Sequence, residues 1–147
     1  MKKEEISALI RNNHDAFNDY MLSLSEGEFM FSLNGDKWTA GQEIEHIMWS
    51  VKMLANALLL PKFFISWKFG VANRPSKTYD VLMDKYIGKL KKIEGSFRLK
   101  LDPVPYIRLG RCPKRLQRNI EVLCRRVKRY SEDNLDRYIL PHCYWGN

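Results

Sequence analysis

A glutamate and a histidine in the first half of the chain have a spacing that could hold a metal ion. Glu43 and His46 are three positions apart, so on a helix their side chains lie on one face. A Glu-x-x-His pair supplies two inward ligands in helical bundles that bind two metal ions. Such a centre needs a second copy of the pair and two more glutamates, and the sequence contains no second copy. The pair alone therefore does not make up a di-metal centre, and a plain buried histidine stays open for His46.

The helix that positions this pair is expected over residues 39–61. Thr39 and Gln42 have the spacing of a capping box, in which each side chain satisfies a backbone N–H of the first turn. Trp38 stands just before this cap, where an apolar side chain packs on the start of the helix. A buried stripe follows at intervals of three and four, formed by Ile44, Ile47, Met48, Val51, Leu54 and Leu58. His46 lies at the flank of this stripe, where an imidazole can face the interior of a bundle.

Three more helices are expected, over residues 4–24, 76–95 and 114–130. Ser76 is a candidate cap for the second of these, and Ser131 can cap one further turn after the third. The third carries a seam of the coiled-coil type, made of Leu116, Ile120, Leu123, Val127 and Tyr130. No convincing run of strands appears, so the pattern predicts an all-α helical bundle.

Three connections are less regular. The segment after residue 24 contains the turn signal Asn34-Gly35-Asp36 and forms either a short hairpin or a loop that packs its aromatic side chains. The segment over residues 63–69 is rich in aromatic residues, so we expect it to pack on the domain. Residues 96–113 contain three prolines and are expected to form an extended linker.

The length of 147 residues and the hydrophobic content of 45% indicate a single globular domain over residues 1–147. Three cysteines without a Cys-x-x-Cys pair fit a reducing compartment. The charged N-terminus lacks the apolar core of a signal peptide, and the longest apolar stretch, over residues 53–65, is too short to cross a bilayer. We therefore expect a soluble, cytoplasmic protein that does not bind a membrane.

The net charge of +8 is concentrated in one region. Nine basic residues and a single acid, Glu121, lie between Arg108 and Arg129, while the rest of the chain is balanced. A solvated helix face explains such a cluster, and so does a surface for phosphate or an acidic partner. The cluster contains no interleaved aromatic residues and no recognition motif, so nucleic acid is not the expected partner. A non-enzymatic binding module that uses this region stays open as an alternative function.

Other chemistry-bearing residues give weaker signals. His14 falls on the apolar face of the first expected helix, which is typical of a hydrogen-bonded core or boundary histidine. Cys112 and Cys124 have many cationic neighbours in the sequence, which could lower a thiol pKa. Neither cysteine has a paired base in the sequence, so no catalytic residue is assigned.

Several short motifs resemble the DinB-like (DinB/YfiT) superfamily in the right order along nearly the whole chain. Trp38-Thr39 followed by His46 resembles the second-helix motif of that family. Arg74-Pro75-Ser76 before a helix with Tyr79 resembles the entry to its third helix. The later matches are Asn134-Leu135-Asp136-Arg137-Tyr138 and the turn Pro141-His142-Cys143-Tyr144-Trp145-Gly146, in which Cys143 replaces a proline.

The resemblance implies an up-down-down-up helical bundle with one divalent metal, zinc, nickel or similar, bound by three histidines. His46 maps onto one ligand, and a His-x-x-x-His pair on a final helix supplies the other two. Family members include metal-dependent transferases that act with low-molecular-weight thiols, and many members have no known activity. The resemblance thus implies a DinB-family, divalent-metal-binding protein of unknown specific activity.

The sequence departs from the family pattern after Gly146, where one residue remains and the final helix with its histidine pair is absent. One histidine cannot hold a catalytic zinc, which needs about three protein ligands. We therefore expect the metal site of this chain to be incomplete and the metal to be weakly bound or absent. The loss of one helix would also expose an apolar groove, so we expect a homo-oligomer, most simply a dimer.

Overall fold

The computed structural model describes residues 2–35, 37–93 and 101–140, and over these residues it is helical with no strand. Its elements are α1 (Lys3–Ser23), α2 (Glu26–Met30), η1 (Leu33–Gly35), α3 (Ala40–Ala57), α4 (Lys62–Phe69), α5 (Tyr79–Ile93), η2 (Tyr106–Arg108), α6 (Cys112–Val127) and α7 (Glu132–Arg137). The predicted all-α class is confirmed for this part of the chain.

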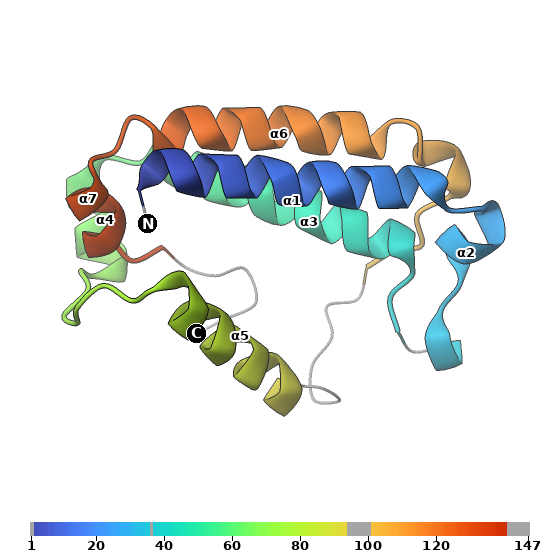
Figure 1. The fold of residues 1–147 in the computed structure, drawn as a ribbon, viewed down its shortest axis with the longest axis horizontal. Coiled ribbons are helices and arrows are strands. Elements are labelled where there is room, and N and C mark those ends of the chain that lie inside the picture. The colour runs from blue at the N-terminus through green and yellow to red at the C-terminus, as the bar shows by residue number, and fades with distance from the viewer. Residues whose placement is uncertain (1, 36, 94–100, 141–147) are drawn as a thin grey trace.

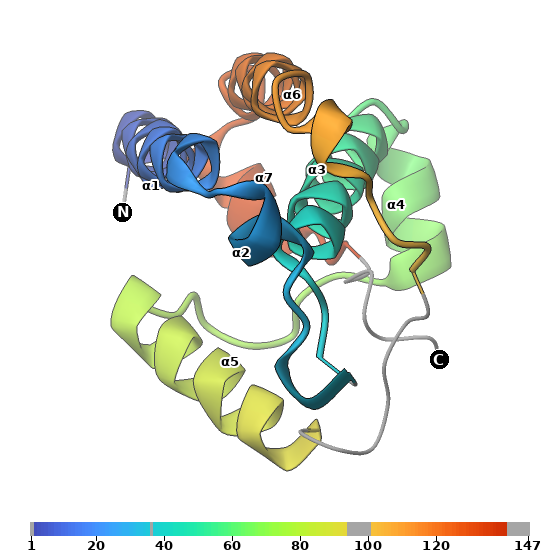
Figure 2. The ribbon, with the colours of Figure 1, turned by 90° about the vertical axis from the view of Figure 1, so that its right-hand side faces the viewer.

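The core lies between three long helices. α6 packs against both α1 and α3, and the three run side by side along the long axis of the molecule (Figures 1 and 2). The seam predicted for α6 is buried in full. α1 contributes Met21 to this core, and α3 contributes Ile44, Met48 and Val51. The spacing of apolar residues therefore predicted the faces that meet in the centre.

The start of α3 is formed as the sequence predicts. Thr39 Oγ1 accepts from the Gln42 backbone N–H at 3.2 Å, and Gln42 Oε1 accepts from the Thr39 backbone N–H at 2.9 Å. Most residues of the apolar stripe predicted for α3 are buried or half-buried, but Leu54 is 41% exposed. Helical spacing places Leu54 at the edge of the apolar arc of α3.

The segment after α1, which was expected to be a hairpin or a loop, begins instead with the short helix α2. Ser25 and Glu28 form a capping box that starts α2, and this short helix carries the fully buried Phe29. The ring of Phe29 meets Tyr106 of η2 edge to face at 5.7 Å. The turn signal is correct, because Asn34 and Gly35 adopt φ values of 57° and 70°.

The aromatic segment after Pro61, which was expected to be a connector, forms the helix α4. Ile65 on this helix is fully buried, whereas Phe63 and Trp67 are 75% and 79% exposed. The segment therefore packs on the domain through Ile65, as expected, while Phe63 and Trp67 stay largely exposed. A helix buries one face only, and Phe63 and Trp67 lie on the other.

α5 begins at Tyr79, and Thr78 accepts from the Val81 N–H at 3.4 Å, so Ser76 is not its cap. Its apolar residues Leu82 and Tyr86 are 46% and 43% exposed. Figure 1 shows α5 standing apart from the layer of α1, α3 and α6. Packing in this structure therefore involves three long helices, and the up-down-down-up bundle implied by the resemblance is not confirmed.

The last described elements follow the prediction closely. α6 begins at Cys112, two residues earlier than expected, because Pro113 is favourable in the first turn of a helix. Ser131 Oγ accepts from the Asn134 N–H at 3.3 Å and starts α7. The predicted motif over residues 141–146, with His142 and Cys143, lies outside the described residues.

Among the described residues, no single helix has both the length and the apolarity to cross a membrane. α3 and α4 taken together meet that test by length and composition, with a bend of 114° between them.

Candidate functional site

His46 is half-buried on the face of α3 that points away from α6. It lies about 160° around the helix from Ile44 and Met48, which pack against α6. Its ring contacts Trp38 with centroids 5.1 Å apart, and its Nε2 lies 3.5 Å from the Ser50 hydroxyl. The imidazole is thus held between a tryptophan and a serine, outside the interface of the three long helices.

Glu43 lies one turn before His46, as the spacing predicts, and loss of solvation raises the pKa of its carboxyl although part of the side chain remains exposed. In the described part of the chain, no group of three histidine, cysteine, aspartate or glutamate side chains could hold a metal ion. These residues therefore do not fit the three-ligand metal of the resemblance, and no chemistry is derived through a metal. His46 as a ligand remains a prediction.

His14 behaves as the sequence predicts for a boundary histidine. It is half-buried on α1, and its Nδ1 donates to the Ile10 carbonyl at 2.7 Å. This bond is the local i to i−4 contact of a helix side chain, so His14 has a structural role.

The two described cysteines differ from the expectation. Cys112 and Cys124 are both buried, and burial raises the pKa of each thiol despite the nearby cations. The Cys124 Sγ lies 3.7 Å from the Ser7 carbonyl inside the α1–α6 interface. The cationic neighbours do lower the pKa of each thiol, as expected, but loss of solvation is the larger effect and the net shift is upward.

Of the nine basic residues between Arg108 and Arg129, five lie on α6 and four lie just before or just after it. Arg126 is half-buried, and the remaining eight are exposed: Arg108, Arg111, Lys114, Arg115, Arg118, Arg125, Lys128 and Arg129. None of the exposed large apolar side chains in the described residues belongs to α6. The outer side of this helix is therefore polar and strongly cationic.

The single acid of this region is paired with another helix. Arg11 of α1 donates from Nε to Glu121 Oε1 at 2.7 Å and from Nη2 to Oε2 at 3.1 Å. This bidentate contact lowers the pKa of Glu121. The negative charge of Glu121 is consequently neutralised from α1 and does not offset the cations of α6.

Three of the arginines surround a groove at the C-terminal end of α6. Arg125, Arg126 and Arg129 line it together with Leu59 and Val122, and it encloses about 260 Å³. Arg126 is anchored, since its Nη1 donates to Asn56 Oδ1 of α3 at 3.0 Å.

The sequence could not indicate the partners that complete these sites. Arg11 and Glu121 are 110 positions apart, and Asn56 and Arg126 are 70 apart. Neither pair shares a motif or a helix, so only the packing of α6 between α1 and α3 brings them together. Arg74 and Lys77 line a second pocket. Arg74 belongs to a family-like motif and Lys77 belongs to no motif, so the sequence did not indicate that pocket.

No family model matches the chain, and no curated protein or solved structure matches it either.

Proposed function

We propose that the chain binds the phosphate backbone of a duplex nucleic acid through the outer side of α6, without reading the base sequence. The observation that carries this proposal is the basic row, which we define as Arg111, Lys114, Arg118, Arg125 and Arg129. All five side chains are exposed. With the one acid of the helix neutralised by Arg11, the row presents an uninterrupted positive charge.

The geometry of the row suits a regular polyanion. Helical spacing places the three members on α6, Lys114, Arg118 and Arg125, within an arc of about 40°. Arg111 and Arg129 flank the two ends of the helix, so the row extends over about 27 Å at the helical rise per residue. This length approaches one turn of a duplex, about 34 Å. Four of the five residues are arginines, whose planar guanidinium groups match phosphate oxygens two at a time.

The surroundings of the row favour a duplex over other anionic partners. Proteins that hold single strands stack bases on aromatic side chains, and the row carries none. A protein partner would need an apolar centre in the interface, and α6 exposes no large apolar side chain. From the sequence, nucleic acid was not expected because of the missing aromatic residues and motifs, but a contact to backbone phosphates alone requires neither.

Salt dependence of binding provides the test. Fluorescence anisotropy with a short labelled duplex is expected to show a log–log slope of about −4, because each neutralised phosphate contributes about −0.9 and four or five contacts are available. Charge reversal in the double variant Arg118→Glu/Arg125→Glu is expected to abolish binding. A matched control, Lys91→Glu/Arg137→Glu, changes the net charge equally at exposed sites outside the row and should retain most of the affinity.

Two results would overturn the proposal. If Lys91→Glu/Arg137→Glu loses as much duplex affinity as Arg118→Glu/Arg125→Glu, the loss is caused by the change in total charge and not by the loss of the basic row. If polyglutamate displaces the duplex at equal charge concentration, the row selects acidic proteins and the partner class is wrong.

A further inference from the structure

A second cationic site lies between the α4–α5 loop and the end of α7. Gly70 leaves α4 with a positive φ of 80°, which turns the chain toward α7. Val71 and Tyr138 then pair as an antiparallel bridge, and the Ala72 N–H donates to the Arg137 carbonyl at 2.8 Å. The loop that follows is therefore held against α7 by the main chain.

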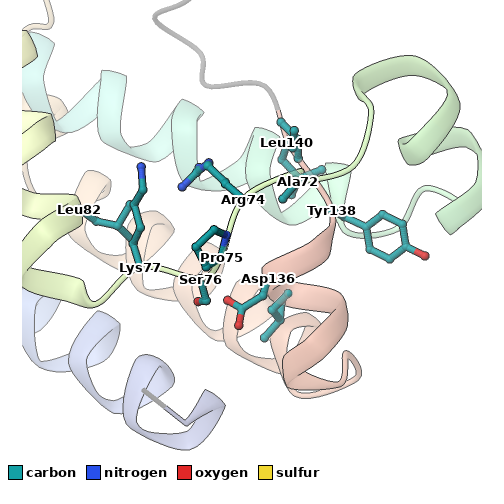
Figure 3. Close-up of a pocket in the computed structure, with 11 residues that line it drawn as sticks. Ala72, Arg74, Pro75, Ser76, Lys77, Leu82, Asp136, Tyr138 and Leu140 are labelled. Atoms are coloured by element: carbon teal, nitrogen blue, oxygen red, sulfur yellow. The ribbon is translucent and has the colours of Figure 1, made fainter.

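A pocket of about 260 Å³ opens between these two segments (Figure 3). Leu82, Leu135 and Ile139 give it an apolar lining. Arg74, Ser76, Lys77 and Asp136 supply its charged and polar groups. The pocket therefore joins a small apolar patch to several charged and polar groups.

The cationic groups of the pocket and its carboxylate lie on opposite sides. Figure 3 shows the charged ends of Arg74 and Lys77 pointing toward one another on one side. The Ser76 hydroxyl and the Asp136 carboxylate lie together on the other side. An anion would therefore be attracted to the first side and repelled from the second.

Additional lysines crowd the cationic side. Interaction with Lys85 of α5, then loss of solvation, and then the positive charges of Arg74, Lys85 and Lys89 lower the pKa of Lys77 to about 8. Like charges this close repel one another, so the arrangement gains stability when an anion binds between them.

We infer that this pocket binds a small phosphate monoester, with its phosphate between Arg74 and Lys77. A phosphate dianion balances this group of cations better than a singly charged carboxylate does. The organic part of the ester lies over Leu82 and Ile139, and a hydroxyl on it can donate to Asp136. The inference is independent of the basic row, because no residue of α6 lines this pocket.

Protection of Lys77 from acetylation tests the site. At about pH 8 a lysine with a pKa of about 8 is about half neutral, so it reacts faster than an ordinary lysine, which is almost fully charged. Phenyl phosphate serves as the probe, and modification is read for each lysine by peptide mass spectrometry. We expect phenyl phosphate to slow acetylation of Lys77 at least about fivefold, with no effect on the exposed Lys52 of α3.

The variant Arg74→Gln should remove the protection while the helical content, measured by circular dichroism, stays unchanged. Arg137→Gln is the matched control, since Arg137 is exposed next to the pocket but does not line it. Protection should persist in Arg137→Gln and in Arg118→Glu/Arg125→Glu. Equal protection of Lys77 and Lys52, or full protection in Arg74→Gln, would show a general ionic effect and overturn the inference.

Discussion

Arg11 and Glu121 join the first long helix to the last through a bidentate contact of 2.7 and 3.1 Å. The contact is exposed enough that its direct contribution to stability is small. Its larger effect is on charge, because it neutralises the one carboxylate that interrupts the cations of α6.

The first prediction concerns this charge. In Arg11→Gln the carboxylate of Glu121 loses its partner and repels phosphate, so we expect duplex affinity at low salt to fall about two- to threefold, the effect of one exposed charge. Anisotropy titrations measure this directly. The double variant Arg11→Gln/Glu121→Gln should recover the affinity of the unchanged protein. A double variant as weak as the single one would mean that Arg11 itself contacts the ligand.

Acid should weaken the same contact in a defined window. The pKa of Glu121 is lowered from 4.5 in the folded chain, so its stabilisation is complete above 4.5 and is lost as pH falls through the lowered value. The exposed pair should contribute no more than about 1 kcal/mol. Urea unfolding of the unchanged protein and of Glu121→Gln should show a stability difference at neutral pH that disappears in acid, as the pH falls below the lowered pKa of Glu121. A difference that persists in acid would contradict the assignment.

Close packing at the start of α3 predicts a sensitive glycine. A Cβ on Gly41 would lie 2.7 and 2.8 Å from the Phe29 ring and 2.9 Å from the Val104 Cβ. We expect Gly41→Ala to lower the free energy of unfolding by about 1–3 kcal/mol through overpacking. Gly88→Ala is the control, since it lies within α5 with no neighbouring atom within 4 Å. It should be neutral or slightly stabilising; equal losses in both variants would refute the packing argument.

The buried thiols should be protected in the folded chain. Because burial raises the pKa of Cys112 and Cys124, little thiolate forms at about pH 8. Iodoacetamide labelling followed by peptide mass spectrometry should modify both at least about tenfold more slowly in the native protein than in urea. Native rates equal to those in urea would show that these cysteines are accessible.

Metal content tests the family-like role of His46. Since the described residues supply no set of three ligands, we expect no stoichiometric zinc or nickel in the purified chain by elemental analysis. Stoichiometric metal that disappears in His46→Ala would contradict this and would revive the transferase hypothesis. His14→Ala is the matched control, because His14 is occupied by a backbone carbonyl. Light scattering on the same samples tests the expected dimer.

The sequence predicted the core well because burial follows periodicity. The seam of α6 from Leu116 to Tyr130 is buried in full, and the Thr39–Gln42 capping box forms as expected. Both signals depend on residues within one helix, whose spacing fixes their geometry.

Features that depend on how the helices meet could not be predicted. The spacing placed His46 at the flank of the apolar stripe, and the packing of α6 against the side with Ile44 and Met48 decides which way that flank faces. Trp67 and Phe63 are large apolar residues of the kind found in protein cores, but both lie on the exposed face of the short helix α4. The pocket beside Arg74 depends on a bridge between Val71 and Tyr138, which are 67 positions apart, and no local pattern encodes it.

The separation of α5 from the other helices has a consequence for how the molecule opens. An isolated helix of 15 residues is marginal in water, and α5 leaves much of its apolar surface wet. Its amide hydrogens should therefore exchange with solvent through local fraying, whereas those of α1, α3 and α6 exchange only when the whole core unfolds. The chain thus combines a cooperative three-helix unit with a segment that can melt on its own, and mild warming would release α5 while leaving the basic side of α6 intact.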